Sequence, residues 1–168
     1  MAAYRPPSPP YAGDDILPTA VMVYDQTRLM RATRLEIWPW IVQLGKGRGG
    51  CRAIDSIWLD IKPGDRVDDY GFSVEDCFDV VAVEPEQHLI YRSERYGAIF
   101  TWTLMLHESS PDADGAARTL VHLRFRGKIA ATGMWQRILV HGGHFMDSMF
   151  SWPMLAGLAE RVEKEHIR

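Results

Sequence analysis

Two pairs of strand-like segments, each joined by a short turn sequence, constrain the fold of this chain most. Segments 78–83 and 88–93 are separated by Glu84-Pro85-Glu86-Gln87, and segments 99–107 and 118–126 flank the turn-rich sequence SSPDADGAA. Both arrangements are typical of β-hairpins. Because sequential hairpins place consecutive strands side by side, the sequence predicts an antiparallel meander.

Further strands are expected on the N-terminal side of this meander. Residues 17–31 are rich in apolar and β-branched side chains, which predicts a strand that ends near Ala32. The turn sequence Pro63-Gly64-Asp65 precedes a short predicted strand near 66–69. These segments extend the predicted sheet beyond the two hairpins.

Alternation within the last two strands predicts which face of the sheet is buried. Val121 and Leu123 share one parity in the last strand, and Leu104 has the matching parity in the strand before it. The same parity holds for Phe100, Trp102 and Leu106. We therefore expect these side chains on the concave, core-facing side and the alternating Arg124 and Arg126 on the surface in water.

The C-terminal part of the chain has the apolar spacing of an amphipathic helix. Between about 133 and 167 the apolar positions recur at three- and four-residue steps, at Phe145, Met149, Trp152, Leu155 or Ala156, Leu158 and Val162. Gly142-Gly143 and Pro153 interrupt this pattern, so we expect two helices or one kinked helix. Together with the meander, this predicts an α+β fold in which a curved antiparallel β-sheet wraps around a long C-terminal helix.

A shorter helix is predicted between the first strand and the meander. Thr33 and Glu36 have the spacing of a capping box, although Pro39 favours a start nearer Glu36, and Gly45 is the expected end. The glycine-rich residues 45–50 contain G-x-G-x-x-G, but a helix precedes them where a dinucleotide site needs a strand. No cofactor is therefore expected.

Length, charge and cysteine content limit the classes of function. A chain of 168 residues is expected to form a single domain at 16–168, preceded at 1–15 by a flexible, proline-rich arm or a loosely docked leader of the first strand. The net charge of −3 does not favour binding to nucleic acid.

No stretch reaches the roughly 20 apolar residues that span a membrane, and no signal-peptide order is present, so a cytoplasmic protein is expected. Cys51 and Cys77 are too few for a disulfide framework or a zinc site and predict reduced thiols.

A cationic region precedes the meander. It contains Arg28, Arg31, Arg34, Lys46, Arg48 and Arg52. Charge runs of this kind are most often solvated faces of neighbouring elements. An interaction module that uses this region is therefore a third hypothesis, behind the two ligand-binding functions given below.

The clearest similarity to known proteins begins at 37–45, Ile-Trp-Pro-Trp-Ile-Val-Gln-Leu-Gly, and continues with Gly47-Arg48-Gly49-Gly50. The same order then contains Lys62-Pro63-Gly64-Asp65, Val83-Glu84-Pro85, Thr101-Trp102-Thr103 and Met154-Leu155-Ala156-Gly157-Leu158. Over roughly 33–163 the chain resembles the START-like, or SRPBCC, superfamily, also called polyketide cyclase/dehydrase-like. The resemblance implies the helix-grip (Bet v 1-like) fold.

The resemblance also implies an internal cavity between the sheet and the C-terminal helix. Such cavities are mostly apolar, with a few polar groups that orient the ligand. The residues expected to line it are Trp38, Arg48, Phe100, Trp102, Leu104, Val121, Leu123, Phe145, Met149 and Trp152, although each could equally fill the core. The chain departs from the pattern at 51–55, which predicts a remodelled pocket entrance.

His141, His144 and Asp147 are the candidate catalytic residues. Their i, i+3, i+6 spacing keeps neighbouring members within reach on a helix, where a carboxylate can orient a histidine base. His144 lies nearest the apolar stripe and is the preferred base. Because no H-E-x-x-H motif is present, no metal site is expected.

Two ligand-binding functions stay open at this point. In the first, the protein binds a hydrophobic metabolite of the polyketide-like or polycyclic kind and catalyses its cyclisation or dehydration, as a lyase-type enzyme of biosynthesis, through confinement and one acid/base group. In the second, it is a non-catalytic carrier or sensor of lipid-like ligands, for which an apolar lining suffices. The expected partner is a hydrophobic small molecule, and a homodimer is left open.

Overall fold

Six antiparallel strands form the framework of the protein. The computed structural model describes residues 9–48, 53–69, 76–95, 97–129 and 151–163. The strands make one sheet in the order β1-β6-β5-β4-β3-β2. Their bounds are β1 (Met22–Met30), β2 (Arg66–Asp68), β3 (Cys77–Glu84), β4 (His88–Arg95), β5 (Ala98–Ser109) and β6 (Arg118–Ile129). The succession of β3, β4, β5 and β6 confirms the predicted meander.

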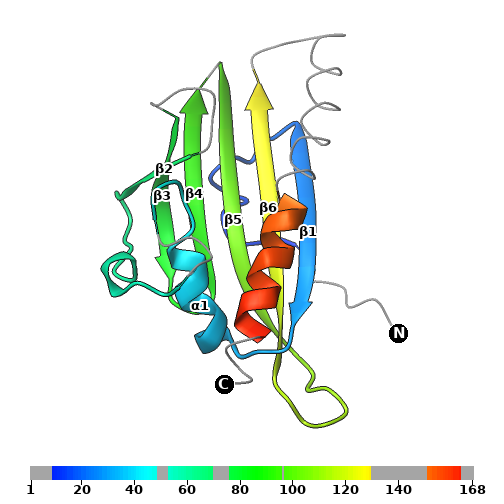
Figure 1. Cartoon of the computed structure of the whole chain (residues 1–168). Helices are drawn as coiled ribbons and strands as arrows, with labels where there is room; N and C mark the ends of the chain where they lie inside the picture. The colour runs from blue at the N-terminus through cyan, green and yellow to red at the C-terminus, as the bar shows by residue number, and fades with distance from the viewer. Residues whose placement is uncertain (1–8, 49–52, 70–75, 96, 130–150, 164–168) are drawn as a thin grey trace.

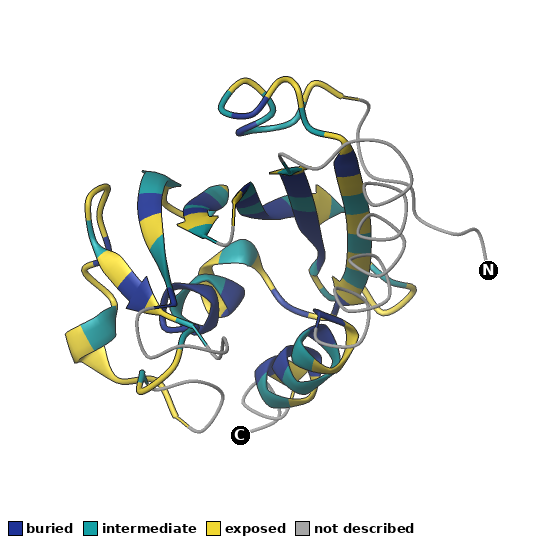
Figure 2. Cartoon of the chain, turned by 90° about the horizontal axis from the view of Figure 1, so that it is seen from above, coloured by how far each residue is buried: buried dark blue, intermediate teal, exposed yellow. Residues whose placement is uncertain are grey.

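Helices cover one face of this curved sheet. Helix α1 (Arg34–Val42) and the helical residues 151–163 lie in front of the sheet in Figure 1 and on one side of it in Figure 2. A short 3-10 helix, η1 (Ser56–Trp58), lies in the connection from α1 to β2. The arrangement confirms the predicted α+β class, with the sheet curved around a C-terminal helix.

The register of β5 and β6 places the apolar core on the helix-facing side. Leu104 lies opposite Leu123, and Trp102 lies opposite Phe125. Leu104, Val121 and Leu123 are at most 1% exposed and belong to one core cluster with residues of the C-terminal helix. This is the parity that the alternation in the sequence predicts.

Helix α1 begins at a complete capping box. The Thr33 hydroxyl accepts a hydrogen bond from the Glu36 backbone N–H (3.2 Å), and the Glu36 carboxylate accepts one from the Thr33 backbone N–H (2.7 Å). These bonds satisfy N–H groups that the first turn of a helix leaves without an intrahelical partner. The helix therefore starts at Arg34, two residues earlier than expected from Pro39, and it ends at Val42 rather than at Gly45.

Gln43, directly after α1, is fully buried and ties the helix to the chain beyond the glycine-rich loop. Its side-chain Nε2 donates to the Ala53 carbonyl oxygen (3.0 Å), and its Oε1 accepts from the Asp55 backbone N–H (3.1 Å). A buried amide that is paired at both ends avoids the desolvation cost of an unpaired polar group. These bonds hold Ala53 and Asp55 beside the end of α1, and η1 follows directly after Asp55.

The C-terminal helix buries a stripe that differs from the predicted one. The buried positions are Ser151, Leu155, Leu158, Ala159 and Val162. Trp152 is 65% exposed, so the helix does not enclose it against the sheet, contrary to its expected place in the apolar stripe. Steps of three and four both fit an amphipathic helix, and among the described residues the first buried position is Ser151 rather than Trp152.

The convex face of the sheet is covered by the N-terminal segment, defined here as residues 9–20 and visible at the top of Figure 2. Gly13 has φ +81°, and a Cβ there would lie 3.0 Å from Ile90 Cδ1 and 3.1 Å from Thr103 Oγ1. A glycine is therefore needed for the close approach of this segment to β4 and β5. The sequence predicts a flexible arm or a loosely docked strand leader for residues 1–15, and in the structure residues 11–17 pack against the sheet.

Arg124 and Arg126 lie beneath this segment, and the prediction that they face water is wrong. Their residues are 7% and 9% exposed. The Asp14 carboxylate accepts from Arg124 Nε (2.8 Å) and from Arg126 Nη1 (3.1 Å), and Asp25 of β1 accepts from Arg124 Nη1 (2.6 Å). Arg126 also donates to the Leu17 carbonyl oxygen (2.9 Å). The alternation of side chains correctly assigns Arg124 and Arg126 to the convex face, but it does not show that the N-terminal segment covers that face.

Replacing Asp14 by asparagine should destabilise the protein by about 2–3 kcal/mol, because two largely buried guanidinium groups lose the carboxylate they share. The matched control is Asp15→Asn, which makes the same change at the adjacent, exposed position and should leave the free energy of unfolding within about 0.5 kcal/mol. Urea unfolding of the two variants measures the difference. Equal effects at both positions would contradict the role given to Asp14.

Candidate functional site

The concave face of the sheet changes character along β5 and β6. At one end Leu104, Leu123 and Val121 are fully buried in the core. Toward the other end the facing positions become aromatic and only partly buried, beginning with the pair Trp102 and Phe125. The aliphatic end is packed as protein interior, whereas the aromatic end retains accessible surface that a ligand could contact.

Three aromatic side chains from adjacent strands form the centre of this region, and we call Phe78, Tyr91 and Trp102 the aromatic cluster. The Phe78 and Trp102 rings are stacked, with centroids 5.9 Å apart and an angle of 23° between planes. Phe78 and Tyr91 have the same centroid distance at a tilt of 57°. Tyr91 and Trp102 are directly paired residues of β4 and β5, so they project from the same face.

Two polar atoms of the aromatic cluster are buried without a partner. The Tyr91 hydroxyl and Trp102 Nε1 are both inaccessible to solvent and make no hydrogen bond among the residues that the structure describes. Tyr91 as a whole is 3% exposed. Burial raises the pKa of the Tyr91 phenol well above its ordinary value, so the hydroxyl stays protonated at neutral pH and is available as a donor.

Arg48, from the loop after α1, lies at the edge of the aromatic cluster. Burial raises the pKa of the Tyr91 phenol, and the positive charge of Arg48 acts against this effect by lowering it. Its guanidinium lies 4.8 Å from the centroid of the Trp58 ring, and its Nη2 is 3.5 Å from the Trp58 carbonyl oxygen. Arg48 is half-buried, and stacking on Trp58 of η1 orients it. The cluster therefore has a cationic rim.

A second group of rings extends the aromatic surface toward β1. Phe100 and Phe125 have centroids 5.4 Å apart, and Tyr24 stacks on Phe125 at 5.9 Å. Gly127 makes this packing possible, because a Cβ there would lie 2.4 Å from Met22 Cε and 3.2 Å from Phe100 Cδ1. The missing side chain leaves room for the rings to close over β6.

The structure separates the predicted lining residues into four groups, the first of which is the exposed Trp152. Leu104, Val121 and Leu123 are fully buried core residues, and Trp38 of α1 is partly buried and packs against the same core. The accessible aromatic end and its rim contain Phe100, Trp102 and Arg48. Phe145, Met149 and the catalytic candidates His141, His144 and Asp147 lie outside the described residues.

Tyr91 and Phe78 are the site residues that the sequence analysis missed. The signal was present, because the turn at 84–87 and the pairing of consecutive strands place Tyr91 opposite Trp102. The alternation of the last two strands, extended across β4, identifies Tyr91, although no sequence pattern shows that its hydroxyl lacks a partner among the described residues.

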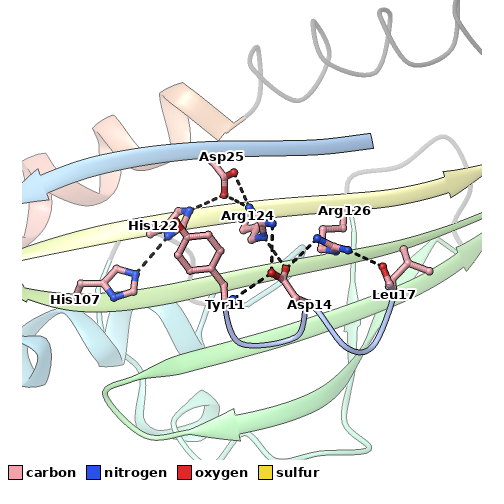
Figure 3. A network of polar contacts seen from close by, with 8 residues as sticks. All are labelled: Tyr11, Asp14, Leu17, Asp25, His107, His122, Arg124 and Arg126. Atoms are coloured by element: carbon pink, nitrogen blue, oxygen red, sulfur yellow. Dashed lines mark hydrogen bonds and ion pairs between the residues drawn. The ribbon is translucent and has the colours of Figure 1, made fainter. Parts of the chain in front are cut away.

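A separate polar cluster occupies the convex face, and the sequence analysis missed it as well (Figure 3). It links Asp25, His122 and His107 in a row, beside the ion pairs of Arg124. His122 is fully buried, with the Tyr11 ring edge-on at 4.9 Å. Alternation predicts that this face of β6 meets water, so the sequence gives no reason to group these residues.

Several other expectations concern isolated residues. Cys77 is a free, half-buried thiol with Arg66 Nε at 2.7 Å from its sulfur, and Cys51 lies outside the described residues. Arg31 and Arg34 of the cationic region form ion pairs with Asp112 and Glu108 of the β5–β6 hairpin.

Within the described ranges, no group of three or more His, Cys, Asp or Glu could hold a metal ion. None of the described helices is long and apolar enough to span a membrane.

Comparison with known proteins shows similarity at the level of structure. No protein-family model and no curated protein matches the chain. SA2116 from Staphylococcus aureus, a protein of unknown function, has 9% identity and a TM-score of 0.56, with 88% of this chain and 96% of that protein covered. The polyketide cyclase-like Cgl2372 from Corynebacterium glutamicum has 9% identity and a TM-score of 0.46, covering 85% and 92%. Ara h 8.0201 has 12% identity and a TM-score of 0.45, covering 84% and 97%.

At such low identities these similarities concern the fold alone. The chain shares its fold with SA2116 and has the helix-grip arrangement that its sequence predicts, a curved antiparallel sheet around a C-terminal helix.

Proposed function

We propose that the protein binds a hydrophobic small molecule against the aromatic end of its concave face. The observation that carries the proposal is the pair of buried donors of Tyr91 and Trp102, which have no partner among the described residues. Leaving such a group unpaired costs about 1–3 kcal/mol, and buried polar atoms in native proteins are almost always bonded to protein, water or ligand. An oxygen atom of a ligand would satisfy these donors.

The surroundings of the donors define the chemical class of this ligand. The stacked rings of Phe78 and Trp102 present flat apolar surface, which suits a planar ring system. The donors require an acceptor such as a carbonyl oxygen, and the rim charge of Arg48 favours partial negative charge on it. A polycyclic or polyketide-like compound, flat and rich in carbonyl groups, has both properties.

Catalysis of cyclisation or dehydration is the further part of this proposal. Hydrogen bonds from Tyr91 and Trp102 to a carbonyl would stabilise the negative charge that develops on its oxygen when a neighbouring carbon loses a proton. Because the Tyr91 phenol stays protonated, it can donate but cannot act as the base at neutral pH. The base must come from another residue, for which His144, oriented by Asp147 or assisted by His141, is our candidate.

A non-catalytic carrier or sensor is the second candidate function. The protonated Tyr91 phenol favours a carrier or sensor, because it can orient a ligand by donating a hydrogen bond but cannot take a proton from it at neutral pH. The two candidates share the binding site and differ only in whether a base faces the ligand.

The unpaired state of the Tyr91 hydroxyl can be tested without a ligand. Tyr91→Phe should leave the free energy of unfolding unchanged or raise it by about 1 kcal/mol, because the variant no longer buries an unpaired hydroxyl. As a contrast, Thr119→Val removes a buried hydroxyl that donates to the Ala32 carbonyl oxygen (2.8 Å) and should destabilise the protein by about 1 kcal/mol. Urea unfolding provides both values, and a destabilising Tyr91→Phe would show that the hydroxyl is paired.

Ligand class can be tested with fluorenone and fluorene, two flat tricyclic probes that differ by one carbonyl oxygen. The wild-type protein should bind fluorenone more tightly, and Tyr91→Phe or Trp102→Phe should weaken that binding roughly tenfold through loss of one hydrogen bond. Fluorene binding should be unaffected by Tyr91→Phe. Tryptophan fluorescence quenching measures the affinities.

Tyr11→Phe is the control for this experiment, because it makes the same change on the convex face. It should not alter the affinity for either probe. Equal binding of fluorenone and fluorene by the wild-type protein would argue against oxygen recognition at the aromatic cluster.

The enzyme and carrier hypotheses are separated by the compound that co-purifies with the protein, identified by native mass spectrometry and extraction. If the protein is an enzyme, His144→Ala and Asp147→Ala should abolish turnover of this compound and leave its affinity within about twofold. A compound that binds and is released unchanged by the wild-type protein would instead support the carrier.

A further inference from the structure

The convex face contains an ordered hydrogen-bonded row that ends at a surface groove. Asp25 Oδ1 lies 2.7 Å from His122 Nε2, and His122 Nδ1 lies 3.3 Å from His107 Nε2 (Figure 3). Asp25 also accepts from Arg124 at 2.6 Å. Burial alone would raise the pKa of Asp25, but hydrogen bonds from His122 and Arg124 lower it overall, so the group is a carboxylate at neutral pH.

The carboxylate determines which nitrogen of each imidazole carries the proton. Asp25 has only acceptor atoms, so His122 Nε2 must donate to it. In an uncharged ring His122 Nδ1 is then an acceptor, and His107 Nε2 must donate to it. The remaining nitrogen of an uncharged His107, Nδ1, is left with its lone pair as a hydrogen-bond acceptor.

His107 lines a groove of about 450 Å³ that lies between the N-terminal segment and strands β4 and β5. This volume is within the range of small-molecule sites. Pro10, Tyr11 and Met105 contribute apolar wall, and His88 adds a second imidazole. The groove is on the opposite face of the sheet from the aromatic cluster.

The charges around the groove indicate an uncharged ligand. Arg34 and Glu108, both in the lining, neutralise each other in an ion pair of 2.7 Å. Burial lowers the pKa of both His88 and His107, and His122 lowers that of His107 further, so both rings are neutral at pH 7. The lining therefore offers apolar wall and a lone pair rather than a net charge.

We propose that this groove is a second ligand site that takes an uncharged ring compound bearing a hydroxyl group, of the phenol class, and that His107 Nδ1 accepts the hydrogen bond of that hydroxyl. His122 and Asp25 act as positioning residues, because they fix the proton on the other nitrogen of His107. The proposal is independent of the function proposed for the concave face.

The proton arrangement can be tested in the wild-type protein by ¹⁵N NMR of the imidazole rings. At neutral pH the His107 ring should be neutral with its proton on Nε2. A His107 ring protonated on Nδ1 would overturn the proposal, since that nitrogen could not then accept. This measurement requires no variant and does not depend on the stability of one.

Binding can be tested with phenol and anisole, which are similar in size but only phenol can donate a hydrogen bond. NMR titration of the wild-type protein should give at least about tenfold tighter binding of phenol, and His107→Phe should remove this preference. Tyr91→Phe, on the concave face, should retain it. Equal affinities for the two probes, or a preference lost in Tyr91→Phe and retained in His107→Phe, would overturn the proposal.

Phenol binding should also depend on pH. His107 is faced by His122 of β6, His88 of β4, Glu108 of β5, Arg34 of α1 and Tyr11 of the N-terminal segment. Because its pKa in the folded protein is lowered, its lone pair is present at neutral pH and is lost as the pH falls through a value below about 6.5. Phenol affinity should fall over that range while anisole affinity stays constant, and parallel curves would contradict the role of His107.

Discussion

The pairing of β5 with β6 is the constraint on which the rest of the structure depends. Each strand has 12 residues, and Leu104 opposite Leu123 fixes both faces at once. A slip of one residue would exchange them, moving Arg124 into the apolar core and Leu123 to the convex face. The core, the aromatic cluster and the polar row of His107 and His122 therefore all follow from one register.

The two faces of the sheet satisfy their polar groups in different ways. On the convex face the charged groups of Arg124 and Asp25 are paired within the chain, and the N-terminal segment completes the pairing through Asp14. On the concave face the donors of Tyr91 and Trp102 are buried without a partner in the described part of the chain. A fold can bury unpaired donors at modest cost if a ligand supplies the acceptor, and the binding function proposed for the concave face rests on these two donors.

How far the sequence could predict this protein depended on the kind of information needed. Alternation and turn sequences predicted the meander and the placement of Leu104 and Val121, because strand periodicity is a local property. They failed for Arg124 and Arg126, since the burial of these residues depends on Asp14, more than 100 positions away in the chain. Trp152 was misplaced because spacing alone does not fix the rotation of a helix about its axis. Tyr91 was within reach of register arguments, but that its hydroxyl lacks a partner among the described residues can be seen only in three dimensions.

The way in which the N-terminal segment attaches determines what its detachment would expose. Its anchors on β6 are charged groups, Arg124 and Arg126, rather than an apolar patch. If the segment is detached, this part of β6 presents guanidinium and imidazole groups that water solvates readily, and it does not present an adhesive hydrophobic surface. Detachment of the segment would therefore open the guanidinium groups of Arg124 and Arg126 to hydration, whereas Ile90 of β4, which lies against Gly13, would lose an apolar cover.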